Sequence, residues 1–243
     1  MQQTLFENKQ VDSPEDKAIH VHPLVSKPLL LHGDCLLKLR SIPDSSIDLI
    51  ITDPPYGVNF TKGYKSGNKE LVHGDDGFSV MIFVDEIAKE FARVLKPDSA
   101  CYVFTRFDVF PYWWLKLKNH LDPKNQIIWN KGGGGMGDLK GNFAFDYESI
   151  IYAAKGKPTI REKRIGSVWN VKKCKQEFHE TQKPVELIEK IITHSSDVGD
   201  VVLDPYMGSG TTGVACAKMK RNFVGIELND TSYQIATKRI EAC

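Results

Sequence analysis

The short segment TDPPYG follows an apolar run at 47–51 that is typical of a buried strand. It brings a carboxylate (Asp53), two prolines (Pro54 and Pro55) and an aromatic ring (Tyr56) to the end of that strand. Proline has a fixed φ and no N–H, so the pair holds the Pro54 carbonyl in one direction. Taken alone, the tetrapeptide is also compatible with a rigid turn, so its meaning depends on the rest of the chain.

A second candidate site is the glycine-rich turn in VVLDPYMGSGTTG, where Gly208, Gly210 and Gly213 follow an apolar strand and open a helix. Glu227 ends the next strand about twenty residues later, a position typical of an acid that binds two ribose hydroxyls. Asp204 stands before the turn, where its charge would oppose a pyrophosphate and suit a cationic ligand. S-adenosylmethionine has ribose hydroxyls and positive charge but no phosphate, and it fits this turn better than a nicotinamide cofactor. The alternative is a tight strand-to-helix turn without a ligand.

These segments need a framework of alternating strands and helices. Strands that alternate with helices favour an α/β fold with a doubly wound, mostly parallel sheet covered on both faces. A short turn-rich link is expected between the first two strands. Apolar runs predict strands at 28–34, 47–51, 100–105, 126–130 and 147–154, helical spacing predicts helices at 81–95 and 185–196, and the C-terminal part has the pattern strand, turn, helix, strand, helix.

Three motifs together resemble the DNA amino-methyltransferases. They are TDPPYG at 52–57, HETQKP at 179–184 and DPYMGSGTT at 204–212, and the resemblance covers about residues 28–242. Their order is that of the permuted, beta-class subgroup. The resemblance implies a Rossmann-like methyltransferase fold with a circularly permuted motif order, in which the two halves of the sheet are swapped in sequence and the strand ends still converge.

The resemblance implies a site for S-adenosylmethionine. The glycine turn would wrap the methionine end of the cofactor, Glu227 would take the ribose hydroxyls, and Asp34 would meet the adenine amino group. The HETQKP segment would cap the methionine moiety, with Lys183 on its carboxylate; a helix-capping turn is the alternative there. The full set of expected cofactor residues is Asp34, Cys35, Asp53, His179, Thr181, Gln182, Lys183, Asp204, Met207, Gly208, Ser209, Gly210, Thr211, Glu227 and Leu228.

The resemblance also implies how the TDPPYG segment acts. Asp53 and the Pro54 carbonyl would accept hydrogen bonds from an exocyclic amine, Pro55 would stiffen the backbone, and Tyr56 would stack on the base. Stacking contributes about 1–3 kcal/mol per base and helps offset the cost of flipping the target out of the duplex. The acid at position 53 favours adenine N6, because cytosine N4 enzymes of this family more often carry serine there. The expected activity is therefore site-specific methylation of adenine N6 in a flipped base.

Basic residues mark the expected DNA contacts. Residues 155–175 hold eight lysines and arginines and one acid, a net charge of +7, whereas the whole chain is only +1. A solvated charged face is the alternative interpretation. Lysines in the loop after Tyr56 would form a second contact. The expected DNA-binding residues are Lys62, Lys65, Arg161, Lys163, Arg164, Trp169, Lys172 and Lys173.

The composition limits the class of protein but does not indicate a specific function. The chain has 243 residues, 26% of them charged, and five scattered cysteines without a C-x-x-C pair, which favours a reducing, cytoplasmic setting. Neither a signal peptide, a membrane helix nor a metal site is expected. The organisation predicted is a polar N-terminal extension at 1–27 and a single methyltransferase domain at 28–243, with a target-recognition segment inserted at about 131–178.

The expected partner is double-stranded DNA, and the family adds two further expectations, a homodimer and a cognate restriction endonuclease. Other functions stay open at this point. The target could be cytosine N4 or an amine in RNA or protein. A regulator that senses S-adenosylmethionine and binds DNA without catalysis is another reading, although Asp53 and Tyr56 argue against it. A nicotinamide dehydrogenase is a remote alternative.

Overall fold

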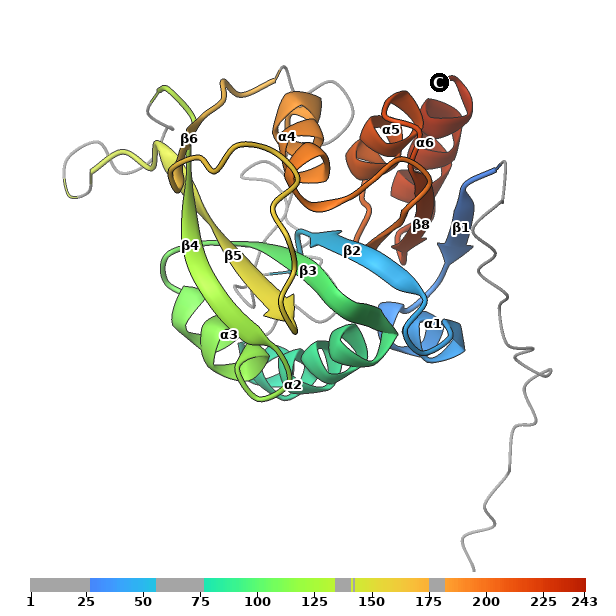
Figure 1. The fold of residues 1–243 in the computed structure, drawn as a ribbon, viewed down its shortest axis with the longest axis horizontal. Helices are drawn as coiled ribbons and strands as arrows, with labels where there is room; N and C mark the ends of the chain where they lie inside the picture. Colours follow the sequence, from blue (N-terminus) through green and yellow to red (C-terminus); the bar gives the residue numbers. More distant parts are fainter. Residues whose placement is uncertain (1–26, 56–76, 134–140, 142, 175–181) are drawn as a thin grey trace, which may run out of the picture.

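The computed structural model describes residues 27–55, 77–133, 141, 143–174 and 182–243, with the backbone alone for 77–83. Most of these residues surround one eight-stranded sheet (Figure 1). Its strand order is β1-β8-β7-β2-β3-β5-β4-β6. The strands are β1 (Leu29–His32), β2 (Ile47–Thr52), β3 (Leu95–Thr105), β4 (Asp122–Asn130), β5 (Tyr147–Lys155), β6 (Val168–Asn170), β7 (Val201–Asp204) and β8 (Asn222–Glu227).

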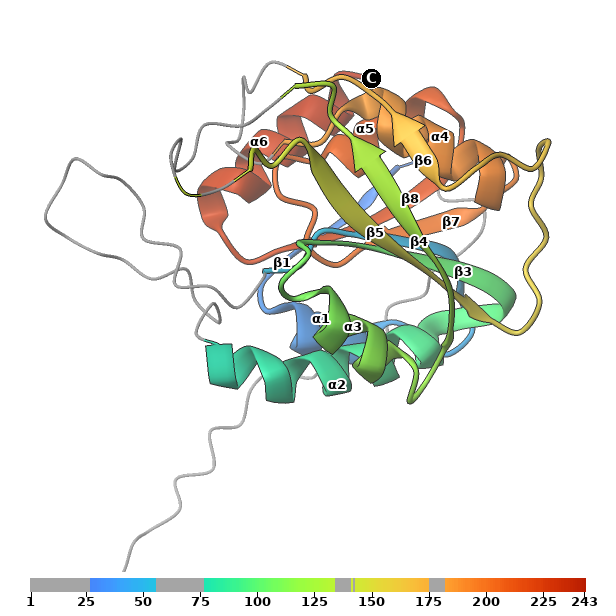
Figure 2. The same ribbon diagram turned by 90° about the vertical axis from the view of Figure 1, so that its left-hand side faces the viewer.

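Helices cover both faces of this sheet. On one face α1, α2 and α3 bury Leu39, Phe91 and Trp113 in a core with β2 and β3; on the other, α4, α5 and α6 bury a second core that includes Ile191 and Ile240. The two layers lie below and above the sheet in Figures 1 and 2. The helices are α1 (Cys35–Ser41), α2 (Gly77–Val94), α3 (Phe110–Leu117), α4 (Val185–Ser195), α5 (Thr211–Lys218) and α6 (Asp230–Glu241). The doubly wound, mostly parallel fold expected from the sequence is confirmed.

Strand β5 runs antiparallel to both of its neighbours, β3 and β4, while the other pairings of this sheet are parallel. The carboxyl ends of the parallel strands and the start of β5 therefore lie along one edge, where doubly wound sheets bind ligands. Strands β2 and β7 are neighbours, with Leu49 opposite Val202 and Ile50 opposite Leu203. The two motif-bearing strand ends, about 150 residues apart in sequence, are thus side by side.

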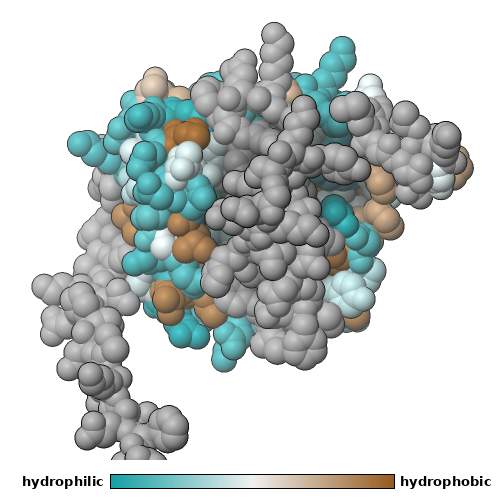
Figure 3. Space-filling model, turned by 180° about the vertical axis from the view of Figure 1, so that it is seen from behind, coloured by the Kyte–Doolittle hydropathy of each residue, from teal (hydrophilic) through white to brown (hydrophobic). Residues whose placement is uncertain are grey.

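Several elements differ from the sequence prediction. The link after the first strand contains helix α1, because the Asp34 side chain accepts a hydrogen bond from the Leu37 N–H and caps it. Strand β3 starts five residues before the predicted 100–105; the polar or proline residues at 96–98, of which Pro97 and Asp98 are exposed, gave no apolar signal for a strand there. Helix α3 and the three-residue strand β6 were not predicted. The opposite side of the molecule mixes polar and apolar groups over its described surface (Figure 3).

Candidate functional site

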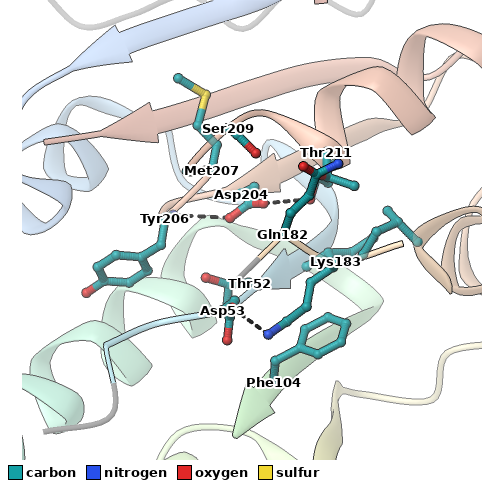
Figure 4. Close-up of a pocket in the computed structure, with 14 residues that line it drawn as sticks. Thr52, Asp53, Phe104, Gln182, Lys183, Asp204, Tyr206, Met207, Ser209 and Thr211 are labelled. Atoms are coloured by element: carbon teal, nitrogen blue, oxygen red, sulfur yellow. Dashed lines mark hydrogen bonds and ion pairs between the residues drawn. The ribbon is translucent and has the colours of Figure 1, made fainter. Parts of the chain in front are cut away.

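A cavity opens at the carboxyl edge of the sheet, between the ends of β2 and β7, the start of α4 and the glycine turn (Figure 4). About 460 Å³ of space, part of it open to solvent, lies between the residues that line it. It is lined by Ile51, Thr52, Asp53, Phe104, Gln182, Lys183, Ile188, Asp204, Tyr206, Met207, Gly208, Ser209, Thr211 and Thr212. Eight of the residues expected to bind the cofactor are therefore at this cavity: Asp53, Gln182, Lys183, Asp204, Met207, Gly208, Ser209 and Thr211.

The glycine turn connects β7 to α5 in a backbone conformation that residues with a side chain rarely adopt. Gly208 and Gly210 have φ values of 52° and 82°, in the left-handed region. A Cβ on Gly210 would lie 2.9 Å from the Cβ of Ala236, so glycine also permits α6 to pack closely on the turn. The Met207 N–H donates to the Ile226 carbonyl at 3.0 Å, which ties the turn to β8. The backbone of the turn is thereby held at the rim of the cavity.

Asp204 is a buried carboxyl group at the end of β7, with 5% of its surface exposed. It accepts hydrogen bonds from the Thr212 hydroxyl at 2.6 Å and the Tyr206 N–H at 3.1 Å. Burial raises the pKa of Asp204 to about 7, against the opposing effect of these hydrogen bonds, and the charges of Asp53 and Glu227 raise it further. Among the residues that the structure describes, no lysine or arginine forms an ion pair with this group. A cation in the cavity would favour its charged form.

The carboxylate of Glu227, at the end of β8, is positioned by the backbone. Its Oε2 accepts from the Gly208 N–H at 2.9 Å and its Oε1 from the Asn229 N–H at 2.7 Å. Strand β1 pairs with β8, so Asp34 follows directly beside this group. The Cys35 thiol donates to the Tyr206 hydroxyl at 3.0 Å, and burial raises the pKa of this thiol to about 12, so it stays neutral.

Of the expected cofactor residues that do not line the cavity, Asp34, Cys35 and Glu227 lie beside the glycine turn, and Gly210 is part of the turn itself. Leu228 is half exposed, and its carbonyl accepts a hydrogen bond from His32 at 3.1 Å. These residues follow the ends of β1 and β8 or belong to the turn that packs against them.

The other side of the cavity holds a charged cluster. The Lys183 Nζ lies 2.7 Å from the Asp53 Oδ2 and 3.1 Å from the Glu148 Oε2, and 5.2 Å from the ring centre of Phe104. Burial alone would lower the pKa of Lys183, but the two carboxylates outweigh burial and raise it above its ordinary value. The sequence led us to expect Lys183 on the cofactor's carboxylate, whereas the structure pairs its ammonium with two carboxylates of the chain.

The residues at the cavity are compatible with S-adenosylmethionine. The buried carboxyl of Asp204 can meet positive charge, and Glu227 beside the turn can accept from ribose hydroxyls. Thr52 adds a third observation: its side-chain hydroxyl is buried at the cavity and has no hydrogen-bond partner within the described part of the chain. A buried polar atom without a partner is costly, and a ligand in the cavity would satisfy it.

Five expected site residues lie outside the part of the chain that the structure describes. They are Tyr56, Lys62, Lys65, His179 and Thr181. Pro54 and Pro55 follow β2 outside regular secondary structure, and Pro54 is buried.

The basic segment before α4 is only partly as expected. Lys163, Arg164, Lys172 and Lys173 are exposed. Lys172 and Lys173 follow β6 shortly after Asn170, whose side chain accepts from Asn130 at the carboxyl edge of the sheet. These two lysines therefore lie at the edge that carries the cavity.

Trp169 of this segment requires correction, and Arg161 lies away from the cavity. Trp169 is 5% exposed, because strand β6 packs its ring into the core beside α4 and its Nε1–H donates to the Gly166 carbonyl at 2.9 Å; it is not presented for stacking on a base. Arg161 is held at the C-terminal end of α4 by its N–H bond to the His194 carbonyl and its ion pair with Asp197, at the opposite end of that helix from Lys183. The structure does not bring Arg161 to the cavity.

Several residues at the site were not anticipated. Thr52 and Phe104 are the last and the penultimate residues of β2 and β3, and Thr212 lies in the first turn of α5. Glu148 is the second residue of β5, where a charged group interrupts an otherwise apolar run. That interruption was the sequence signal available for Glu148, since a charge at the start of a buried strand needs a partner.

Comparisons with known proteins agree with this geometry. The model of the DNA methylase (N6/N4 methyltransferase) family matches residues 47–238, which includes both motif-bearing strands and the cavity. The chain belongs to the DNA methylase family. The resemblance drawn from the three motifs is thereby confirmed.

Named relatives and a solved structure extend over most of this methyltransferase. It is 29% identical to the DNA adenine methyltransferase YhdJ of Escherichia coli (strain K12), over 87% of the chain and 82% of the relative. It is 31% identical to the type II methyltransferase M.HinfI of Haemophilus influenzae, over 87% of the chain and 67% of that relative. The crystal structure of the M1.HpyAVI–SAM complex superposes on the chain with a TM-score of 0.67 and 27% sequence identity. The match covers 88% of this chain and 100% of that one.

Proposed function

We propose that this protein methylates the N6 amino group of adenine in DNA with S-adenosylmethionine as methyl donor. The observation that carries the proposal is the cavity between β2 and β7, which Asp53 and Asp204 enter from adjacent strand ends. One carboxylate can serve an amine and the other a cationic cofactor. The relatives support adenine as the target, since YhdJ is named a DNA adenine methyltransferase.

The glycine turn and its neighbours would hold the cofactor. Asp204 and the turn from Met207 to Thr211 meet its methionine end, Glu227 its ribose, and Asp34 its adenine; His179, Thr181 and Gln182 would close over it. Support comes from the buried Asp204 carboxyl and from the hydrogen bond that links Glu227 to the turn. When bound, S-adenosylmethionine supplies a sulfonium methyl group that an amine can take directly, without a covalent enzyme intermediate.

The TDPPYG segment would bind the target base. The exocyclic nitrogen of adenine is a poor nucleophile because its lone pair is delocalised into the ring. Hydrogen bonds from the amine to Asp53 and to the Pro54 carbonyl would hold that nitrogen and favour its pyramidal form, while Tyr56 stacks on the base. Positioning at the end of a rigid strand then supplies most of the rate.

The experiment that tests this function is direct. The purified protein is incubated with duplex DNA and S-adenosylmethionine, the DNA is digested to nucleosides, and these are separated and weighed. N6-methyldeoxyadenosine is the expected product. N4-methyldeoxycytidine would favour the alternative target, and unmodified DNA alongside methylated RNA or protein would contradict a DNA substrate.

DNA would contact the carboxyl edge of the sheet. We infer that exposed Lys163, Arg164, Lys172 and Lys173, together with Lys62 and Lys65, bind phosphates, and that the segment at about 131–178 carries target recognition within a domain that begins near residue 28. Exposure of the first four residues supports this. Trp169 and Arg161 are left out of the contact set for the reasons given above.

Three further expectations belong to the same proposal. A homodimer is supported by apolar side chains on α3, where Tyr112 and Leu115 are 50% and 62% exposed, and light scattering of the purified protein tests it. A cognate restriction endonuclease is suggested by the type II relatives. A cytoplasmic setting agrees with the five free cysteines. The described residues contain no helix that is both long and apolar enough to span a bilayer.

A further inference from the structure

Four charged residues form a chain of ion pairs that ends at Asp53. The Lys131 Nζ lies 3.0 Å from the Glu148 Oε1, the Glu148 Oε2 lies 3.1 Å from the Lys183 Nζ, and the Lys183 Nζ lies 2.7 Å from the Asp53 Oδ2. These residues come from the end of β4, the start of β5, the segment before α4 and the end of β2. Groups distant in sequence thus converge on one carboxylate.

Lys183 is buried, and the other three residues of this chain of ion pairs are partly buried. The side chains of Lys131, Glu148 and Lys183 are 13%, 16% and 9% exposed, against 23% for Asp53. Charges removed from water are costly, and removing one partner of a buried pair leaves the other uncompensated. Lys183 also lies over the ring of Phe104 (Figure 4), which limits where its ammonium can move. The geometry around Asp53 is therefore constrained by its neighbours.

Glu148 occupies the central place in this arrangement. Strand pairing fixes its backbone, because Glu148 lies opposite Trp129 in the β4–β5 ladder. Each of its two oxygens faces one lysine, so the pKa of Glu148 is kept below its ordinary value by Lys183 and Lys131 although burial acts in the other direction. A carboxylate that ionises readily and is fixed by strand pairing is a suitable anchor for the Lys183 ammonium.

We propose that Glu148 is a positioning residue for methyl transfer: it holds the Lys183 ammonium against Asp53 and so fixes the carboxylate that receives the target amine. This inference rests on the proposed function of Asp53. It assigns Lys183 to the base side of the cavity instead of to the methionine carboxylate of the cofactor. Glu148 is not among the residues that line the cavity and would act through Lys183 and Asp53.

The test compares Glu148→Gln with a matched control. Asp48→Asn removes the carboxylate of another partly buried ion pair, with Lys96 at 2.7 Å, at the opposite edge of the same sheet. The Asp48 side chain is 17% exposed, close to the value of 16% for Glu148. Both variants are assayed for thermal unfolding, for cofactor affinity by calorimetry, and for methyl transfer in a single turnover with saturating DNA and cofactor.

Glu148→Gln is expected to slow the single turnover about 100-fold, the scale of effect for misplaced reacting groups, with cofactor affinity within about twofold of the wild type. Asp48→Asn should keep the wild-type turnover rate even if it lowers the unfolding temperature as much as Glu148→Gln does. A wild-type rate in Glu148→Gln overturns the proposal. So does a rate loss matched by an equal loss of cofactor affinity, because Lys183 would then serve the cofactor.

A second variant covers the case in which Glu148→Gln does not fold. Glu148→Gln combined with Lys183→Met removes the two central charges together, so that neither is left facing the other's neutral replacement, and the ions that lose a partner are the two at the ends of the chain, Lys131 and Asp53. Its turnover should be as slow as expected for the single variant, since Asp53 lacks its ammonium; turnover near the wild-type rate contradicts the proposal. Absence of any methylated base with the wild-type protein would instead contradict the proposed function.

Discussion

Asp53 and Asp204 end neighbouring strands at one cavity, yet their surroundings differ. Asp53 has a lysine of the chain 2.7 Å away, within a partly buried network of four charges. Asp204 is more deeply buried and is held by a hydroxyl and a backbone N–H, and the pKa of its carboxyl is about 7. Asp53 is thus paired with Lys183 of the chain. For Asp204, no lysine or arginine of the described residues forms an ion pair with it, and a bound ligand could provide the cation.

This difference explains how one sheet edge can bind two unlike reactants. The ammonium of Lys183 lies against the Asp53 carboxylate, whose oxygens can accept hydrogen bonds from a neutral amine. The uncompensated burial at Asp204 favours a positively charged molecule, which S-adenosylmethionine is. The predictions below test whether the two sides of the cavity are separable in this way.

The largest expected effect is that of Asp53→Ala on methyl transfer. Loss of the acceptor should reduce the single-turnover rate about 1000-fold, a scale typical of removing one preorganised polar group from an active site. The rate is measured with labelled cofactor and a saturating duplex. Asp98→Ala, at the opposite edge of the sheet, serves as a surface control; a rate within tenfold of the wild type in Asp53→Ala would remove this carboxylate from the mechanism.

A smaller effect is expected on the DNA side. Replacing Lys172 and Lys173 together by glutamate should weaken duplex binding roughly tenfold or more and reduce the dependence of log K on log salt by about 2, since each lost phosphate contact contributes about 0.9. Fluorescence anisotropy at several salt concentrations measures both. The same change at exposed Lys218 and Lys220 is the control, and an unaltered salt slope in the first variant would place these lysines off the interface.

The mildest expected effect is on pH dependence. Because the folded pKa of Asp204 lies near 7, above its ordinary 3.8, its carboxyl stabilises the protein below about pH 4 and this contribution is lost as pH rises to about 7. A cationic ligand prefers the ionised form, so cofactor affinity should rise about tenfold between pH 6 and pH 8. Calorimetry at both pH values measures this, and Asp204→Asn should abolish most of the dependence; an equally steep dependence in that variant contradicts the assignment.

The motif residues could be placed from sequence because they follow strands. Asp53 and Asp204 each end a short apolar run, and parallel strands bring such ends to one edge. Gly208 and Gly210 predicted a turn between a strand and a helix, and the structure has such a turn, with both glycines in left-handed backbone. The order of motifs then predicted that β2 and β7 would be neighbours although they are far apart in the chain.

The partners of these residues could not be placed from sequence. A lysine next to a helix start is equally compatible with a ligand carboxylate or with Glu148 and Asp53, and only tertiary packing selects the latter. Trp169 stands among basic residues and was therefore assigned to DNA, but a three-residue edge strand buries its ring. The residue types around a position therefore predict its local charge well, but they do not predict whether its side chain is buried.

The central claim is that the two carboxylates serve different reactants, and the most direct measurement is cofactor affinity in Asp53→Ala and Asp204→Asn, determined side by side by calorimetry at pH 8. We predict that Asp53→Ala binds S-adenosylmethionine within about threefold of the wild type and that Asp204→Asn binds it at least about tenfold more weakly, the loss of a charge pairing. Equal losses in both variants, or a loss confined to Asp53→Ala, would contradict the account.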